Sequence, residues 1–344
     1  MKCYYAKETE AHDPVFRLSL GQIARNAEQA ERARLLLAGL DRLGLPVTAP
    51  APVPREILGR VHTQNLLTFL ETGWDEWQTL PGAGPEVVPN VHALNSERTY
   101  PAHIVGKAGW HMGDTSAPLA QHSWKATLGA AAAAHAAAEA VQQGDSVAYA
   151  LCRPPGHHSS ADVVAGHCMI NCAAVAVETL KPTHPRIAVL DIDVHHGNGT
   201  QDIFYERDDV LFVSIHATPE TYYPFFVGYA HETGRGAGEG FNLNIPLNQS
   251  TGDDGWCDAI SASLERIAAF GPDALVVSLG LDAHENDPLK GLKVTFDGFR
   301  RAGNMIAAAG FPTVLVQEGG YLSPDLTTSL VAYLAGHAGI EIAL

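Results

Sequence analysis

Five stretches of the chain are apolar almost without interruption, and polar residues and glycine follow each one directly. They are SVAYALC (146–152), RIAVLDID (186–193), DVLFVSIH (209–216), ALVVSLGLD (274–282) and TVLVQEGG (313–320). A strand that is covered on both faces shows such a continuous apolar run, whereas a half-exposed strand alternates. The pattern therefore predicts five buried strands of a parallel sheet.

Helical periodicity occupies the segments around these strands. It predicts helices over 22–43, 54–71, 124–143, 169–180, 200–207, 253–270, 296–309 and 325–336. Strands that alternate with helices build a parallel sheet that helices cover on both faces. No long linker, charge run or repeat divides the chain, so we predict an α/β fold with an open parallel sheet in a single domain over residues 1–344.

Residues 72–123 differ from the rest because they show little periodicity and are rich in Gly, Pro, Trp and His. A long stretch without clear elements inside a compact domain is usually functional or disordered. We expect a long loop excursion beside the functional site. Its Trp74, Trp77 and Trp110 suit either a subunit interface or packing within the loop.

Composition narrows the class of protein. Hydrophobic residues make up 46% and charged residues 17%, as in a globular protein with a large core. The start MKCYYAKETEAHDP lacks the features of a signal peptide, and the five cysteines lack disulfide-framework spacing, so we expect reduced thiols and a cytoplasmic location. The net charge of −16 argues against nucleic-acid partners and is compatible with cationic ones. The apolar stretches, including the alanine-rich 129–140, are too short to predict a membrane span.

Chemically reactive residues gather where the predicted strands end. The endings are RPPGHH, DIDVHHGNG, LGLDAHEND and QEGGY, and the remaining strand ends in His216. Open α/β sheets bind their ligands at the carboxyl ends of the strands. The sequence therefore predicts one site built from several strand ends.

Three of these residues form a candidate metal site. Asp193 and His195 are two apart and so share a face of an extended segment, and Asp282 ends another strand. Two carboxylates and one imidazole leave coordination positions open, which is typical of a catalytic zinc site. Oxygen and nitrogen ligands do not exclude Fe(II), Mn(II) or Co(II).

The same strand ends supply candidates for acid–base work. His157 and His158 can accept a proton from water and return it to a departing amine. Asp191 and Asn198 are available to orient these imidazoles. Tyr321 follows two glycines and could donate a hydrogen bond to an oxyanion.

Taken together, the motifs RPPGHH, GxCxxNxAAVA, DxDVHHGNGTQ, SIH, LGLDAH and QEGGY occur in an order that resembles the histone deacetylase family of the arginase–deacetylase fold. The resemblance runs from about residue 12 to the C-terminus. It is strongest to the bacterial acetylpolyamine amidohydrolases, because of RPPGHH, the long 72–123 excursion and the total length.

The resemblance implies a role for each matching residue. One zinc ion per subunit would be bound by Asp193, His195 and Asp282. His158 would act as general base and then general acid, with His157 as its electrostatic partner. The remaining catalytic residues would be Asp191, which accepts from His157, Asn198, which accepts from His158, and Tyr321, which polarises the acetyl carbonyl.

The resemblance also implies two potassium ions. The first would be held by Asp191, Asp193, His195, Ser214 and Ile215. The second, more remote ion would be held by Phe204, Arg207, Val210 and Phe241.

A narrow tunnel for the aliphatic part of the substrate would be lined by Gly166, His167 and Tyr223, with Gly320 beside it. The family usually has Phe or Tyr at the position of His167 and Phe at that of Tyr223, so this tunnel is more polar. Glu97 and Asp114 are candidates for binding a distal ammonium of the substrate.

The expected activity is zinc-dependent hydrolysis of acetylated diamines and polyamines to acetate and free amine, by a homodimer without nucleic-acid or membrane partners. One alternative is an acetyl-lysine protein or peptide deacetylase, and another is an amidohydrolase of a different small acylamide, suggested by His167. A non-catalytic acetyl-amine binder is disfavoured because no matching catalytic residue is lost. Binuclear manganese chemistry is disfavoured because only one DxDxH set is present.

Overall fold

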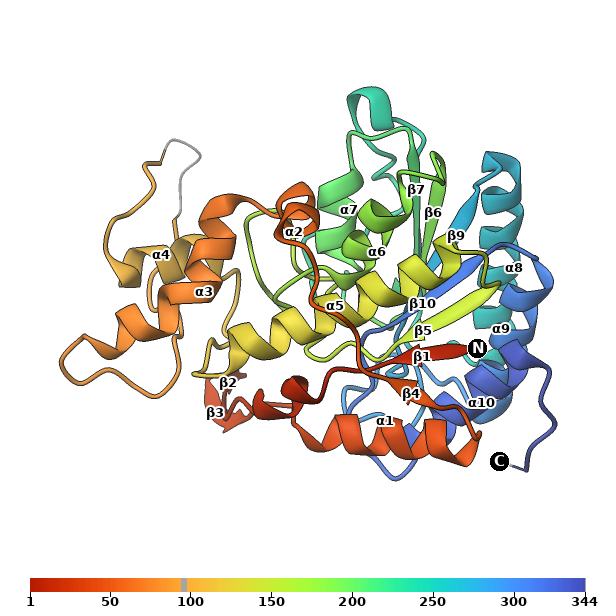
Figure 1. Ribbon diagram of the computed structural model, residues 1–344, viewed down its shortest axis with the longest axis horizontal. Coiled ribbons are helices and arrows are strands. Elements are labelled where there is room, and N and C mark those ends of the chain that lie inside the picture. Colours follow the sequence, from red (N-terminus) through yellow and green to blue (C-terminus); the bar gives the residue numbers. More distant parts are fainter. Residues whose placement is uncertain (94–97, 344) are drawn as a thin grey trace.

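The structure, a computed structural model, describes residues 1–93 and 98–343. In these residues eight strands form one sheet, and every neighbouring pair is parallel (Figure 1). The strand order is β4-β1-β5-β10-β9-β6-β7-β8. The strands are β1 Lys2–Tyr4, β4 Val47–Thr48, β5 Val147–Ala150, β6 Ile187–Asp191, β7 Val210–Ala217, β8 Asn242–Leu247, β9 Ala274–Leu279 and β10 Thr313–Gln317.

Helices cover both faces of this sheet. One apolar cluster joins α5 and α6 to residues such as Ala148 and Ala150, and the other joins α1, α8, α9 and α10 to Tyr149 and Leu151. The helices are α1 Glu31–Arg42, α2 Arg55–Val61, α3 Gln64–Gln78, α4 Ile104–His111, α5 Ser123–Gln142, α6 Cys172–Leu180, α7 Asn198–Phe204, α8 Asp253–Phe270, α9 Phe296–Ala308 and α10 Leu326–Ala338, with 3₁₀ turns η1 Lys7–Ala11 and η2 Gly236–Gly238.

The predicted α/β fold with a parallel sheet and helices on both faces is confirmed. All five predicted strands are present and occupy the middle of the sheet as β5, β10, β9, β6 and β7. The prediction missed the strands at the two edges, β4 and β1 on one side and β8 on the other. Their signal is weak because β4 and β1 are only two and three residues long, and β8 contains two asparagines and a proline.

The helix predicted over 22–43 is wrong in its first part. Residues Phe16–Ser19 (β2) and Gln22–Arg25 (β3) form an antiparallel hairpin, and the helix α1 begins only at Glu31. The two residues between the strands, Leu20 and Gly21, both have positive φ, as a two-residue hairpin turn that matches the twist of the strands requires. The periodicity of the Glu31–Arg42 segment had been extended too far toward the N-terminus.

Two further corrections concern residues 54–123. The predicted helix 54–71 is split at His62, which is extended, and Thr63 caps a new helix by accepting a hydrogen bond from Leu66 N. That helix, α3, continues to Gln78, and α4 covers Ile104–His111. The expected excursion over 72–123 is therefore partly helical.

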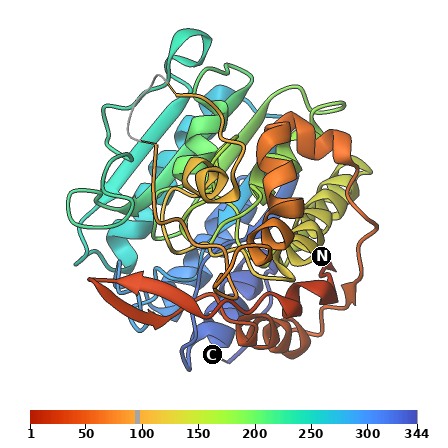
Figure 2. The same ribbon diagram turned by 90° about the vertical axis from the view of Figure 1, so that its left-hand side faces the viewer.

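The hairpin, α3 and α4 lie together on one side of the molecule. They are on the left of Figure 1, toward which β1 and β5 run, and Figure 2 looks onto this side. The hairpin, α3 and α4, which are not part of the sheet, thus lie near the carboxyl ends of its strands.

The cysteines bear on whether the chain forms disulfides, and the helices on whether it spans a membrane. The five cysteines are all buried and free. Across the residues that the structure describes, every helix is too short or too polar to cross a membrane.

Candidate active site

Asp193, His195 and Asp282 come together just beyond the ends of β6 and β9. His195 Nδ1 lies 3.0 Å from Asp193 Oδ1 and 3.2 Å from Asp282 Oδ2. All three side chains are buried, and their candidate ligand atoms lie within 4.8 Å of one another. Two ligand atoms of a tetrahedral zinc ion are roughly 3.4 Å apart, so this spacing is close to that of a ligand set.

The surroundings of these three residues fit a bound cation. Asp282 Oδ2 is buried and accepts no hydrogen bond with good geometry from the described residues. A side chain at Gly319 would collide with Asp282 Oδ2, so glycine keeps this oxygen accessible. The other carboxylate oxygens are fixed by backbone donors, Val194 N on Asp282 Oδ1 and Gly319 N on Asp193 Oδ2. A positive ion would compensate the two buried carboxylates.

Two histidines lie side by side next to this group, each oriented by a hydrogen bond from Nδ1. His157 donates to Asp191 Oδ2 at 2.9 Å, and His158 donates to Asn198 Oδ1 at 2.7 Å. The two rings have centroids 4.0 Å apart. Both Nε2 atoms therefore remain available for chemistry, and the two partners are those implied by the resemblance.

The two histidines differ in charge. Burial, together with the neighbouring His157 and His195, lowers the pKa of His158 well below its usual value. Burial also opposes charge on His157, but the carboxylates of Asp193 and Asp191 outweigh it and raise the pKa of His157 well above its usual value. His158 is thus the neutral imidazole suited to accept a proton at neutral pH.

Tyr321 reaches the same place from the turn after β10. Its hydroxyl lies 3.1 Å from His167 Nδ1, and its backbone N–H donates to Asp287 Oδ2 at 2.8 Å. Burial raises the pKa of Asp287 to about 7. Gly320 lies behind the phenol and accepts a hydrogen bond from Arg32 Nε through its carbonyl.

A cavity of about 410 Å³ leads to these groups. It is lined by His158, His167, His195, Tyr223 and Tyr321. Gly166 also lines it, with φ of 54°, and a side chain there would collide with the His158 ring. The tunnel positions implied by the resemblance therefore surround the catalytic groups.

Asp114 lines this cavity and supports its wall. Its Oδ2 accepts from the Tyr223 hydroxyl at 2.7 Å and from Gly166 N at 3.1 Å, and its Oδ1 accepts from Ser116 N at 2.8 Å. Asp114 therefore fixes two tunnel residues in this structure. Glu97, the other predicted contact for an ammonium, lies outside the described residues.

Sequence reasoning missed a buried layer behind the site. Arg32 forms an ion pair with Glu28, donates to the carbonyls of Glu318 and Gly320, and lies 5.0 Å from the centre of the Tyr321 ring. The segment EQAERA, residues 28–33, belongs to the resemblance, but nothing in its helical pattern shows that Glu28 and Arg32 are buried. Asp287 could have been found, because it belongs to the LGLDAHEND segment that contains Asp282.

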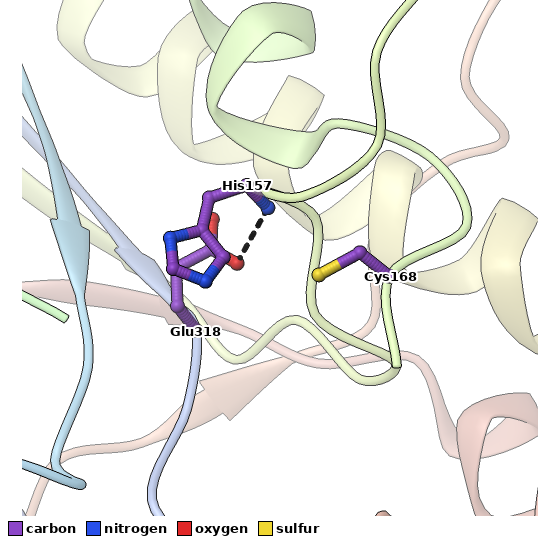
Figure 3. A group of neighbouring side chains, drawn as sticks. All are labelled: His157, Cys168 and Glu318. Carbon is purple, nitrogen blue, oxygen red and sulfur yellow. Dashed lines mark hydrogen bonds between the residues drawn. The ribbon is translucent and has the colours of Figure 1, made fainter. Parts of the chain in front are cut away.

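Glu318 belongs to this layer and, with His157 and Cys168, forms a second buried group of metal-ligand type (Figure 3). Its Oε2 accepts from the backbone N–H of Gly156 and of His157, so it pins the RPPGHH loop. Burial raises the pKa of Glu318 to about 7 and that of Cys168 well above its usual value. A protonated thiol is a poor ligand, and His157 Nδ1 is already bonded to Asp191, so a structural role accounts for this group.

The residues predicted to hold potassium lie in two places. Asp191 and Ser214 are register partners on β6 and β7, and Ser214 Oγ is 2.9 Å from His216 Nδ1. Ile215 follows on β7, and Asp193 and His195 belong to the group above. Of the second set, Arg207 N donates to Phe204 O, the Phe241 carbonyl accepts from Phe212 N, and Val210 begins β7.

Comparisons with known proteins agree with this geometry. A model of the histone deacetylase domain matches residues 26–337. Acetylpolyamine amidohydrolase of Burkholderia pseudomallei is 39% identical over 342 residues, which cover 99% of this chain and 100% of that protein. Acetylpolyamine amidohydrolase 1 of Pseudomonas aeruginosa is 40% identical over 344 residues, which cover 98% of this chain and 99% of that protein.

Solved structures show the same similarity. The crystal structure of acetylpolyamine aminohydrolase from Burkholderia pseudomallei superposes with a TM-score of 0.94 at 39% identity and covers 99% of both chains. The crystal structure of the HDA15 HD domain superposes with a TM-score of 0.82 at 26% identity and covers 99% of this chain and 90% of that one. The chain therefore belongs to the histone deacetylase family.

Proposed function

We propose that this protein is a zinc-dependent amidohydrolase that cleaves the acetamide of small linear acetylated amines to acetate and free amine. The observation that carries the proposal is that His158, His195 and Tyr321 line one cavity, with His157, Asp193 and Asp282 buried directly behind them. Its full-length relatives bear the name acetylpolyamine amidohydrolase, so acetylated diamines and polyamines are the first compounds to test.

The metal would be held by Asp193 Oδ1 or Oδ2, His195 Nδ1 and Asp282 Oδ2. A zinc ion bound there supplies Lewis-acid chemistry, because it lowers the pKa of water and polarises a carbonyl. Three ligands from the protein leave room for a substrate, as catalytic zinc sites require. Zinc, rather than another divalent metal, is part of the proposal.

The side chains divide the remaining work. His158 Nε2 takes a proton from the attacking water, and its Nδ1–H remains fixed on Asn198. Tyr321 donates a hydrogen bond from its hydroxyl to the acetyl carbonyl oxygen as negative charge develops there, and keeps its proton. His158 then gives its proton to the amide nitrogen, so the C–N bond breaks to leave acetate and a free amine.

Three parts of the proposal concern assembly and ions. We propose that the chain acts as a homodimer in which the segments around the cavity mouth contribute to the interface. We also propose one potassium ion near Asp191 and Ser214 and a second near Phe204 and Phe241. Sedimentation analysis and elemental analysis for potassium test these parts independently of activity.

The experiment that tests the function is a turnover comparison with zinc-loaded protein. N-acetylputrescine, N-acetylcadaverine, N8-acetylspermidine and an acetyl-lysine tetrapeptide are offered at several concentrations, and released acetate is measured. Higher kcat/KM for the small amines supports the proposal. Preference for the peptide would instead make the protein an acetyl-lysine deacetylase, and failure to hydrolyse any acetamide would refute the proposed reaction.

A second candidate is an amidohydrolase of a different small acylamide. The polar tunnel walls favour it, because His167 and Tyr223 each carry a hydrogen-bonding group. The charged side chains that line the cavity indicate more specifically which acylamides would bind.

A further inference from the structure

The mouth of the cavity carries one permanently charged cation, Arg17. Among the described residues that line the cavity, it is the one arginine or lysine. It lies in β2, and its chain neighbours Leu18 and Ser19 also line the cavity. Its charge acts on the tunnel, because after burial itself the Arg17 guanidinium contributes most to lowering the pKa of His167.

The strand that carries Arg17 is firmly held. The Glu86 carboxylate accepts from Val15 N at 2.7 Å and from Phe16 N at 2.9 Å. Asn26 Nδ2 donates to Phe16 O at 2.9 Å and to Ser116 O at 3.1 Å. These contacts tie the residues around Arg17 to Glu86, Asn26 and Ser116, so the fold sets the position of Arg17.

Arg17 differs from three other arginines of this region because it has no counterion among the residues that the structure describes. Arg25 on β3 lies 3.6 Å from Asp13, and the buried Arg32 and Arg153 both pair with Glu28. By contrast, the guanidinium of Arg17 forms no ion pair with any carboxylate in the part of the chain that the structure describes. It is half-buried, so its charge is partly shielded from water.

Asp114, the carboxylate that lines the same cavity, forms no ion pair with Arg17 in the described structure and keeps its own negative charge. Its oxygens already accept three hydrogen bonds, from Tyr223, Gly166 and Ser116. The cavity therefore combines an occupied carboxylate on its wall with an available guanidinium at its mouth.

If the acetamide of a substrate lies at the metal site, the other end of the substrate approaches these charges and is attracted or repelled by them. A distal ammonium would approach a like charge, whereas a carboxylate would meet a guanidinium that can bind it through two N–H groups. The overall charge of −16 attracts cations only from a distance, and salt screens it beyond about 8 Å. A substrate group that touches the guanidinium directly is not screened in this way.

We propose that, among small linear acetylated amines, this enzyme selects substrates whose far end carries a carboxylate, and that Arg17 binds that carboxylate. The proposal rests on the proposed function and names its substrate class. N-acetylated ω-amino acids belong to this class. Acetylated diamines and polyamines, which bear a distal ammonium, are then the poorer substrates.

A matched series of compounds tests the selection. 5-Acetamidopentanoate, N-pentylacetamide and N-acetylputrescine share an acetamide on a four-carbon chain and end in carboxylate, methyl and ammonium groups. With the zinc-loaded enzyme, kcat/KM is expected to fall in that order, by roughly tenfold from first to last. Homologues with three, five and six methylenes show whether the order is independent of length.

Substitutions in the β2–β3 hairpin test whether Arg17 causes this order of preference. Arg17→Gln is expected to remove the preference for carboxylate over ammonium, and Arg17→Glu to invert it. Arg25→Glu makes the same charge change on the neighbouring strand, outside the cavity, and is expected to leave the order unchanged. An equal or higher kcat/KM for N-acetylputrescine in the unaltered enzyme, or an unchanged order in Arg17→Glu, overturns the proposal.

A binding measurement separates this proposal from the proposed reaction. Calorimetry on zinc-loaded Tyr321→Phe protein, whose turnover is expected to be greatly slowed, gives Kd values for 5-acetamidopentanoate and N-acetylputrescine. Roughly tenfold tighter binding of the carboxylate, reversed by adding Arg17→Glu, supports the role of Arg17 even if the unaltered enzyme hydrolyses neither compound. Tighter or equal binding of the ammonium compound refutes it even if hydrolysis occurs.

Discussion

The buried groups at the inner end of the cavity, here called its floor, are held more tightly than the residues around its mouth. At the floor, Asp193 and Asp282 are fully buried and held by backbone donors, so each position is set by several contacts at once. At the mouth, Leu20 of the hairpin is fully exposed and Phe225 is 47% exposed. Our hypothesis is that the residues of the floor determine which reaction occurs and those of the mouth determine which molecule enters. Changes at the floor should therefore act on metal binding and kcat, and changes at the mouth on KM and preference.

The largest effect is expected from removing a metal ligand. Asp282→Ala leaves Asp193 and His195 without their third partner, so we expect zinc to bind more than about 100-fold less tightly and activity to be lost. Zinc per chain is measured by elemental analysis after dialysis. Glu285→Gln, an exposed change in the same loop, is the control. Full zinc occupancy in Asp282→Ala would exclude this ligand assignment.

Removing the base should be nearly as severe while leaving the metal in place. For His158→Ala we expect kcat/KM to fall by roughly 10²- to 10⁴-fold with normal zinc content. Since the pKa of His158 is lowered by burial, the unaltered enzyme should keep its base deprotonated at neutral pH and lose activity only as pH falls well below 6.5. A rate near that of the unaltered enzyme would remove His158 from the mechanism.

Tyr321→Phe tests the third catalytic group of the floor. Loss of one donor to a developing oxyanion costs roughly 10²- to 10³-fold in kcat. KM should change little, because the phenol acts on charge that develops during the reaction. The measurement is a steady-state comparison, and a fall in kcat/KM that comes entirely from KM would assign Tyr321 to substrate binding instead.

His167 lies between floor and mouth and should have a smaller effect. If its Nδ1–H donates to the Tyr321 oxygen, the phenol proton is left for the substrate. We expect His167→Phe to lower kcat between about twofold and tenfold, and His167→Asn, which retains a donor near Nδ1, to recover part of the loss. In a Tyr321→Phe background the same change should have no further effect. An undiminished loss in that background would mean that His167 acts independently of Tyr321.

The smallest effect is expected at the tunnel wall. Tyr223→Phe removes one hydrogen bond to Asp114 and keeps the ring that packs against His158. We expect KM to rise by less than about tenfold, with kcat and zinc content unchanged. Should kcat fall by orders of magnitude, the separation of floor and mouth proposed above would not hold.

The same contrast explains what could be predicted from the sequence. The central strands are buried on both faces, so their continuous apolar runs were identifiable, and the residues that follow them locate the floor. The resemblance supplied the partners of His157 and His158, and the structure places Asp191 and Asn198 there.

The mouth was harder because it is formed by short elements and loops. The β2–β3 hairpin depends on a positive φ at Leu20, a residue type that does not favour it, so the sequence carries no hairpin signal and the pattern predicts a helix from residue 22 on, over β3. Arg17 gave no signal for the same reason, since its role follows from where the hairpin places it. Arg32 and Glu28 were missed because only the tertiary structure shows that these charges are buried behind Tyr321.

The central claim is that a metal held by Asp193, His195 and Asp282 supports acetamide hydrolysis. The most direct test is acetate release from small acetylated amines by the protein as loaded with zinc, after chelation, and after zinc is returned. We predict that chelation abolishes acetate release and that about one zinc ion per chain restores it. Undiminished release from metal-free protein would contradict the account.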